Sequence, residues 1–256
     1  YVDDAFSAAH RAHASTEAIA HLLPAYVGEA MRRELDALDR ALGHPERPVL
    51  GIVGGSKVST KLELLKHLVT KLDRLAIGGG MANTFLYAQG WEVGGSYCEK
   101  DLAEAARDVI REAGRNHCEL LLPIDIVVGE TAQPGAAARV RGLGELDEHE
   151  RILDAGPQTV ERLTRAMDVS KTLIWNGPLG VFEIRPFDRG TVAAARHAGE
   201  LARAGKLVAV AGGGDTVAAL KAAQVVDHFT YVSTAGGAFL EWMEGKPLPG
   251  VEALKR

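Results

Sequence analysis

Cysteine is nearly absent from this sequence, and aromatic residues are scarce. Only Cys98 and Cys118 occur among 256 residues, and they lack the C-x-x-C spacing of metal and redox sites. We therefore expect two free thiols in a reducing cytoplasm and no disulfide framework. No apolar run approaches the roughly 20 residues of a membrane helix, and no signal peptide is visible. These absences favour a cytoplasmic protein without membrane contact.

An excess of positive charge is also missing. The formal net charge is −5, which disfavours a nucleic-acid partner because such proteins carry a basic footprint. Glycine is abundant by contrast, with 29 residues. The length allows one large domain or two small ones. The chain opens at Tyr1 within a strand-like pattern, so we expect an upstream segment to precede it.

Short apolar runs alternate with amphipathic helical patterns along most of the chain. The patterns predict strands at 48–53, 74–77, 119–122, 124–128, 172–175, 207–211 and 228–232, and helices at 57–70, 81–89, 101–114, 157–167, 188–204, 216–223 and 237–244. Strand–helix–strand units in series predict an α/β fold, a doubly wound parallel sheet with helices on both faces. The first 45 residues do not follow this alternation, because the apolar spacing at 25–42 predicts one long helix that connects two parts of the protein. Residues 128–141 are the best loop candidate.

Four predicted strands end in glycines that precede a helix or a turn: Gly54-Gly55, Gly78-Gly79-Gly80, Gly177 and Gly212-Gly213-Gly214. Glycine allows close backbone approach to a ligand, and a helix N-terminus behind it favours phosphate. Every tight strand-to-helix turn accepts glycine, so one such turn alone would be weak support. Four on the same predicted sheet edge indicate a phosphate-handling site.

The usual nucleotide fingerprints are not matched. Residues 51–57 (GIVGGSK) fit neither G-x-G-x-x-G nor G-x-x-x-x-G-K-[ST]. An NAD-dependent oxidoreductase, the reading that a dinucleotide fold would suggest, is therefore disfavoured. Nor does the sequence set up a nucleophilic Ser, Cys or His.

Two groups near the glycine turns could carry phosphate chemistry. Lys57 and Lys61 are four residues apart, which would place them on one helix face as a phosphate-binding pair or as a solvated surface pair. Asp215 follows three glycines at a helix start. It could cap that helix or hold Mg²⁺, and its position alone leaves both readings open.

Six motifs in collinear order resemble those of the phosphoglycerate kinase family. They are DAFSAAHRAHAST at 4–16, GGSKVSTK at 54–61, GGGMANTF at 78–85, WNGPLGVFE at 175–183, GGGDT at 212–216 and STAGGAFLEWMEGKPLPG at 233–250. The resemblance runs from residue 1 to 256. It implies reversible phosphoryl transfer from 1,3-bisphosphoglycerate to Mg-ADP in glycolysis, by a two-domain enzyme.

The resemblance also implies a domain division. Residues 1–24 correspond to the end of the N-terminal substrate domain and the hinge, and 25–45 to a connecting helix. Residues 46–236 correspond to the C-terminal nucleotide-binding domain, and 237–256 to a helix and tail returning toward the N-terminal domain. Most of the phosphoglycerate-binding domain would be lacking. A monomer with small-molecule substrates is expected.

Each matching residue acquires an implied role. The implied nucleotide-binding set is Lys57, Lys61, Gly79, Gly80, Asn176, Glu183, Gly213, Gly214, Asp215 and Thr216. Within it, Lys57 would stabilise the transferring phosphoryl group, Glu183 would accept from the ribose hydroxyls, and Asp215 would hold Mg²⁺.

Further roles lie outside the nucleotide set. The amides of Gly236 and Gly237 would face the transferring group, and Arg11 would reach the phosphoglycerate. His10 and His13 are read as structural or substrate-adjacent and not as general bases.

The sequence departs from the family pattern at several positions, namely Ser7, Ala8, Thr60, Glu150, Ala235 and Phe239. Glu150 stands where many members have Trp, which leaves the packing around 154–157 open. Thr60 stands where some members have Asp, so no second magnesium contact is expected there. The alternative to a kinase is a catalytically silent nucleotide-binding fragment, because domain closure is part of such mechanisms.

Overall fold

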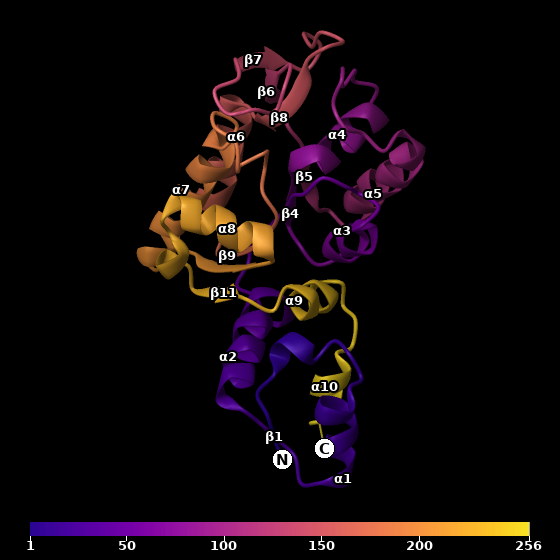
Figure 1. Ribbon diagram of the computed structural model, residues 1–256, viewed down its shortest axis with the longest axis vertical. Helices are drawn as coiled ribbons and strands as arrows, with labels where there is room; N and C mark the ends of the chain where they lie inside the picture. Colours follow the sequence, from indigo (N-terminus) through magenta and orange to yellow (C-terminus); the bar gives the residue numbers. More distant parts are fainter. Residues whose placement is uncertain (256) are drawn as a thin grey trace.

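A six-stranded parallel sheet forms the centre of the molecule. The computed structural model describes residues 1–255 and is drawn in Figure 1. The sheet order is β11-β10-β9-β3-β4-β5, and all its neighbouring strands are parallel. Its strands are β3 (Val49–Val53), β4 (Arg74–Ile77), β5 (Glu119–Leu121), β9 (Thr172–Asn176), β10 (Val208–Gly212) and β11 (Tyr231–Ser233). The predicted doubly wound parallel sheet is confirmed.

The strand order contains one reversal. From β3 the chain moves outward to β4 and β5, and it later returns to β9 beside β3 before continuing to β10 and β11. In open sheets of this kind, ligands bind outside the carboxyl ends of the strands, at the point where the order reverses. The topology therefore predicts a ligand site at the carboxyl ends of β3 and β9.

Helices cover both faces of the sheet, as its apolar strands require. The helices of this part are α3 (Leu62–Leu68), α4 (Gly79–Ala88), α5 (Ala103–Arg115), α6 (Pro157–Asp168), α7 (Arg189–Arg203), α8 (Gly214–Ala223) and α9 (Gly236–Met243), with short turns η4 (Lys100–Leu102) and η5 (Val226–His228). Alternate strand residues enter two separate cores. Val53 and Ile77 pack with α3, α4, α5 and α9, whereas Ile52 and Trp175 pack with α6, α7 and α8.

A second, antiparallel sheet of three strands was not anticipated. It has the order β7-β6-β8 and consists of β6 (Asp125–Gly129), β7 (Arg139–Gly142) and β8 (Arg151–Ala155). The strand predicted at 124–128 exists as β6 but does not join the parallel sheet. The predicted loop at 128–141 contains the start of β7. That strand is half polar and largely exposed, so it carries no apolar signal.

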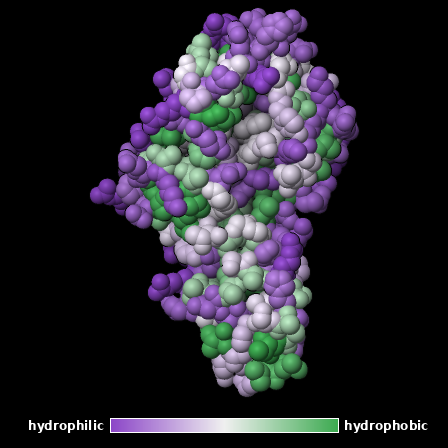
Figure 2. Space-filling model, viewed as in Figure 1, coloured by the Kyte–Doolittle hydropathy of each residue, from purple (hydrophilic) through white to green (hydrophobic). Residues whose placement is uncertain are grey.

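The first and last segments of the chain lie together at one end of the molecule (Figure 1). They comprise β1 (Val2–Asp3), η1 (Phe6–Ala8), η2 (Ala14–Ala18), α1 (Ile19–Leu22), β2 (Tyr26–Val27), α2 (Glu29–Leu38), η3 (Asp39–Gly43) and α10 (Pro249–Glu252). The backbone amide of Gly250 donates to the carbonyl of Ala9 at 2.9 Å, which ties the C-terminal segment to the N-terminal one. In Figure 2, apolar side chains gather at this end, where Val2, Leu22 and Leu23 are exposed.

The single helix predicted at 25–42 is wrong at its start, whereas helical backbone does extend to Gly43, next to the predicted end. Tyr26 and Val27 instead pair with β1, and α2 begins only at Glu29. The Asp4 carboxylate accepts from the amide of Met31 at 2.8 Å and so occupies one of the free donors in the first turn of α2. The regular helix ends at Leu38 and continues as the wider turn η3.

Candidate functional site

The four glycine turns meet at one edge of the parallel sheet, as the sequence predicted. The turns after β3 and β9 touch directly. A Cβ atom on Gly54 would lie 1.8 Å from the carbonyl oxygen of Pro178, and one on Gly177 would lie 2.2 Å from that of Gly54. Gly177 also has a φ of +100°, which favours glycine. The glycines here allow β3 and β9 to bring their loops into contact at the reversal of strand order.

Lys61 and Asn176 connect these turns through side-chain hydrogen bonds. The Lys61 ammonium donates to the Asn176 Oδ1 at 2.5 Å and to the Gly54 carbonyl at 2.6 Å. The Asn176 amide nitrogen donates to the Gly212 carbonyl at 2.9 Å. The hydroxyl of Thr216 accepts from the amide of Gly177 at 2.7 Å. The ends of β3, β9 and β10 are thus fixed relative to one another.

The Lys61 ammonium is buried among these partners. Its burial lowers the pKa of Lys61 from 10.5 to about 8, and the negative charge of Asp215 opposes that decrease only partly. A Cβ on Gly55 would lie 3.6 Å from the Lys61 Nζ, so the ammonium sits directly behind the glycine turn. Lys61 can therefore place a fixed positive charge at the base of the site.

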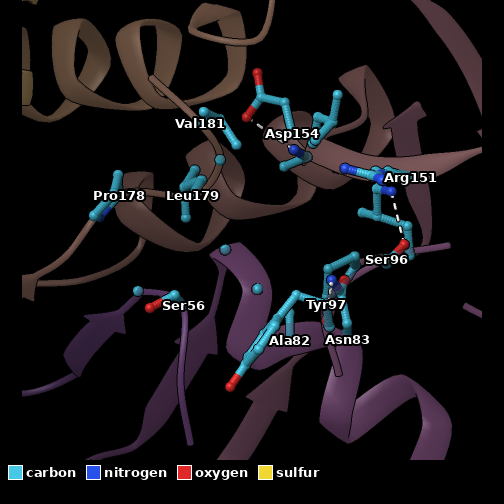
Figure 3. A pocket seen from close by; sticks show the side chains of 18 of the residues that line it. Ser56, Ala82, Asn83, Ser96, Tyr97, Arg151, Asp154, Pro178, Leu179 and Val181 are labelled. Carbon is cyan, nitrogen blue, oxygen red and sulfur yellow. Dashed lines mark hydrogen bonds between the residues drawn. The ribbon is translucent and has the colours of Figure 1, made fainter. Parts of the chain in front are cut away.

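A cavity of about 610 Å³ opens in front of these turns (Figure 3). Gly79 and Gly80 line one side of it, and Leu179, Glu183 and Asp215 line another. Its volume is within the range of about 300–1,000 Å³ typical of small-molecule sites. The structure therefore brings the implied adenosine, ribose and metal residues to one cavity.

Asp215 is exposed in the first turn of α8 and lines this cavity. In residues 1–255 no side chain caps α8 at its N-cap, Gly213, so the capping interpretation of Asp215 is not supported. Gly213 has a φ of +98°, and a Cβ there would lie 2.7 Å from the Asn176 amide nitrogen. Gly214 has open space where a side chain would be. This turn leaves the start of α8 accessible to a ligand.

The prediction that Lys57 and Lys61 share one helix face is wrong. Helix α3 begins at Leu62, and Lys57 lies in the preceding loop, where it is exposed. Gly55 has a φ of +135° and turns the chain before that loop. The two lysines therefore differ, because one is held in the network and the other faces solvent beside the turn.

Arg11, Gly236 and Gly237 lie outside the residues that line the cavity. A Cβ on Gly237 would lie 2.9 Å from the His10 Nε2, so the start of α9 packs closely against that imidazole. Arg11 forms an ion pair with Glu241 of α9 at 3.0 Å. The start of α9 nevertheless approaches the site, because a Cβ on Gly236 would lie 4.0 Å from the Gly213 Cα.

Asp154 is a buried residue of the cavity wall that sequence reasoning missed. Its carboxylate accepts from the amides of Gly190 at 2.7 Å and Ala155 at 2.9 Å. Burial raises the pKa of Asp154 to about 7, although those hydrogen bonds favour the charged form. The signal available was an aspartate at the end of an apolar run, Ile152-Leu153-Asp154, in a region with no expected strand.

The loop of residues 94–97 forms another wall that was missed. The Ser96 hydroxyl accepts from the amide of Ile152 at 2.8 Å, and the Asn83 amide nitrogen donates to the Tyr97 carbonyl at 3.1 Å (Figure 3). Gly94 approaches the carbonyl of Glu150 closely. The Gly94-Gly95 pair was the available signal, but it follows no predicted strand.

The structure accommodates two of the departures from the family pattern, Phe239 and Glu150. Phe239 is fully buried, and its ring occupies the space that a side chain at Gly212 would need, with Cδ1 at 2.6 Å from the Cβ position. Glu150 is buried and receives Arg141 at 3.1 Å and Arg139 at 3.4 Å. The hydrogen bond from Arg141 keeps the pKa of Glu150 below its usual range. An ion-pair cluster therefore surrounds Glu150, at the position where many family members have Trp.

Other expectations concern groups away from the cavity. Cys98 and Cys118 are both free thiols. Among residues 1–255, no helix is long and apolar enough to cross a membrane.

The same residues contain no group of three or more His, Cys, Asp or Glu side chains able to hold a metal ion. A metal at Asp215 would therefore need most of its oxygen ligands from a bound molecule or water.

Comparison with known proteins gives consistent matches. A family model described as phosphoglycerate kinase matches residues 1–246. The chain is similar to phosphoglycerate kinases of Caulobacter vibrioides (strain NA1000 / CB15N), 68% identical over 255 residues, and of Rhizobium meliloti (strain 1021), 60% identical over 256 residues. Each match covers 100% of this chain and 64% of the relative. The chain thus spans slightly less than two thirds of the length of these relatives.

Two solved structures share the fold. The phosphoglycerate kinase of Coxiella burnetii matches with a TM-score of 0.95 at 44% identity, covering 99% of this chain and 64% of that one. The enzyme of Pyrococcus horikoshii OT3 matches with a TM-score of 0.82 at 27% identity, covering 99% and 63%.

Proposed function

Because this chain belongs to the phosphoglycerate kinase family, we propose that it supplies the nucleotide-binding part of a phosphoglycerate kinase. The proposed reaction is reversible phosphoryl transfer from 1,3-bisphosphoglycerate to Mg-ADP, giving 3-phosphoglycerate and ATP. An oxygen of the ADP β-phosphate attacks the acyl phosphate, and the bond from phosphorus to the carboxylate oxygen breaks. The carboxylate of 3-phosphoglycerate is the leaving group.

One observation carries this proposal. The cavity lies at the carboxyl ends of parallel strands, at the reversal of strand order, and it is lined by Gly79, Gly80, Glu183 and Asp215. Glycines allow the nucleotide to approach the backbone, and Glu183 can accept hydrogen bonds from ribose hydroxyls. The Lys61 ammonium behind Gly55 gives the cavity a positive base for phosphate oxygens.

Phosphoryl transfer requires positioning and charge neutralisation, and no covalent catalyst. Lys61, held by Asn176 and Gly54, positions the phosphate chain, and Thr216 and Gly214 line it at the start of α8. Lys57 is exposed and can swing toward the transferring group. The first-turn amides of Gly236 and Gly237 have no acceptor within their own helix and can donate to its oxygens.

Asp215 fits a magnesium site, because it is an exposed carboxylate that lines the cavity where the nucleotide phosphates are proposed to bind. Mg²⁺ usually takes one or two carboxylates plus phosphate oxygens and water. When bound, the ion would neutralise phosphate charge.

We further propose the following division of labour for a monomeric cytoplasmic enzyme. Residues 46–236 form the nucleotide domain, and 25–45 connect it to residues 1–24. Residues 237–255 return to the N-terminal segment, with residue 256 outside the described residues, and Arg11 reaches the phosphoglycerate after leaving Glu241. The alternative is a silent nucleotide-binding fragment, because closure of two domains around the substrates is part of such mechanisms.

The proposal is tested by calorimetric titration of the 256-residue chain with ADP, with and without Mg²⁺. We expect binding that strengthens with the metal and is weakened in Asp215→Ala. Failure of ADP to bind, or binding indifferent to Mg²⁺ and to Asp215→Ala, would contradict the proposal. A coupled ATP assay separates the two candidates, because we expect little or no turnover by this chain alone.

A further inference from the structure

A second hollow lies beside the three-stranded sheet, outside the nucleotide cavity. Its volume is about 560 Å³, and residues of β6, β7 and the first turns of α6 and α7 line it. These elements lie at the upper left of Figure 1. We propose that this hollow binds a small amphipathic monoanion, an apolar ring or chain that carries one carboxylate.

The floor of the hollow is apolar. Val127 of β6 and Val140 of β7 are direct cross-strand partners, so their side chains lie on the same face of the sheet. Val160 of α6 and Ala193 of α7 line the opposite side. Val140 is 55% exposed although it stands in this apolar surface. A ligand with an apolar body would remove that surface from water.

The charged lining residues of the hollow are two arginines, Arg139 and Arg189, and no acidic residue lines it in the described chain. Arg139 shares the Glu150 carboxylate with Arg141. Arg189 is exposed, and it forms no ion pair or side-chain hydrogen bond within residues 1–255. A guanidinium binds a carboxylate through two parallel hydrogen bonds. The lining therefore complements a single negative charge beside an apolar body.

The two nearby helix N-termini do not supply the anion site. The amides of Gln158 and Thr159 in α6 already donate to the Asp125 carboxylate at 3.0 and 2.7 Å. The Gly190 amide of α7 donates to Asp154. The arginine side chains are therefore the donors left for the carboxylate.

Ala155 lines both this hollow and the nucleotide cavity, so β8 separates the two. Asp154 lines the nucleotide cavity and binds Gly190, which lines the hollow. The site is thus adjacent to the nucleotide site but distinct from it, and it makes no use of the phosphate-binding turns.

The test is a calorimetric titration of the 256-residue chain with 2-naphthoate, a two-ring carboxylate, and with neutral 2-naphthamide. We expect saturable binding of naphthoate, weaker binding of the amide, and a loss of naphthoate affinity on the order of tenfold in Arg189→Ala. Arg203→Ala removes the same charge from the far end of α7 and should bind as the parent does. Equal affinities for the two compounds, or equal effects of the two substitutions, would overturn the proposal.

Two further variants locate the probe. Val140→Glu places a carboxylate in the apolar floor and should repel naphthoate, whereas Arg151→Ala alters the nucleotide cavity and should leave naphthoate binding unchanged. Thermal unfolding confirms that each variant folds. Loss of binding in Arg151→Ala but not in Val140→Glu would assign the probe to the nucleotide cavity and refute the site. Absence of saturable binding below about 1 mM would refute it as well.

Discussion

The Nζ atom of Lys61 lies 2.5 Å from the Oδ1 atom of Asn176, across the junction of β3 and β9. The two residues are 115 positions apart in the sequence, and the hydrogen bond joins the two halves of the parallel sheet. Because the amide nitrogen of Asn176 binds Gly212, one side chain orients both the lysine and the turn that precedes α8. Asn176 would therefore act on the proposed phosphate site by holding Lys61 and the turn before α8 in place.

We expect Asn176→Ala to cost about 1–3 kcal/mol of unfolding free energy, because it removes one of the acceptors of the buried Lys61 ammonium and the side-chain donor of the Gly212 carbonyl. ADP affinity should fall as well. Urea unfolding and ADP titration measure the two effects. Asn116→Ala, at the exposed end of α5, is the matched control and should change stability by less than about 0.5 kcal/mol. Comparable losses in both variants would contradict the role of Asn176.

The ADP affinity of the chain should fall as pH rises through about 8. The pKa of Lys61 is lowered to about 8 in the folded protein, so its positive charge is lost there well before that of an ordinary lysine. Stability should move in the opposite direction between about pH 8 and 10.5, because the unfolded chain then binds more protons than the folded one. Titrations at several pH values test both trends. In Lys61→Met, ADP affinity and stability should both vary less with pH above neutrality. If they vary as in the parent, a group other than Lys61 causes the two trends.

Asp154 should make the protein less stable as pH rises from about 4 to 7. Its pKa is raised to about 7, so the folded state binds the proton more tightly than the unfolded state, whose carboxyl titrates near 3.8. Asp154→Asn cannot titrate, and its urea midpoint should vary less over this window than that of the parent. The exposed Asp227→Asn variant should keep the parent's pH profile. Parallel profiles for the parent and Asp154→Asn would contradict the prediction.

Gly212→Ala should destabilise the protein by about 1–3 kcal/mol, because the Phe239 ring fills the space next to Gly212. Trimming the ring in Phe239→Leu should relieve part of this clash. The double variant is then expected to lose less than the sum of the two single losses. Urea unfolding of the four proteins completes the cycle, and simple additivity would rule out the proposed conflict.

In a full-length kinase that carries this sequence, Lys57→Ala should lower kcat far more than nucleotide affinity. Lys57 is free of the Lys61 network and exposed, so it can interact with the transferring group without anchoring the resting nucleotide. Steady-state kinetics and ADP titration give the two quantities. Equal losses in both would indicate that Lys57 only binds. Lys71→Ala, on an exposed surface position, should change neither.

Local patterns were sufficient for the main sheet and for the edge at which its glycine turns meet. Apolar runs that end in glycine turns predicted β3, β4, β9 and β10, and parallel strands necessarily bring their carboxyl ends to one edge. They failed for β7, because its polar and partly exposed residues lack the apolar period on which such predictions depend. They failed for β8 because its apolar run is short and ends in a buried aspartate, Asp154. They also failed at 25–28, where pairing with β1 overrides the helical spacing of Met31 and Leu35.

The sequence by itself determined the family motifs, the parallel order of alternating strands and helices, and the residue types that can handle phosphate. Only the tertiary structure decided which of these groups meet. Lys61 turns inward to Asn176 while Lys57 faces solvent, although both belong to one short motif, because α3 begins after Lys61 and not before Lys57. Asp154 and the loop at 94–97 join the cavity wall through contacts between distant segments. Such contacts depend on how β8 packs against α4 and α7, and no local spacing encodes that packing.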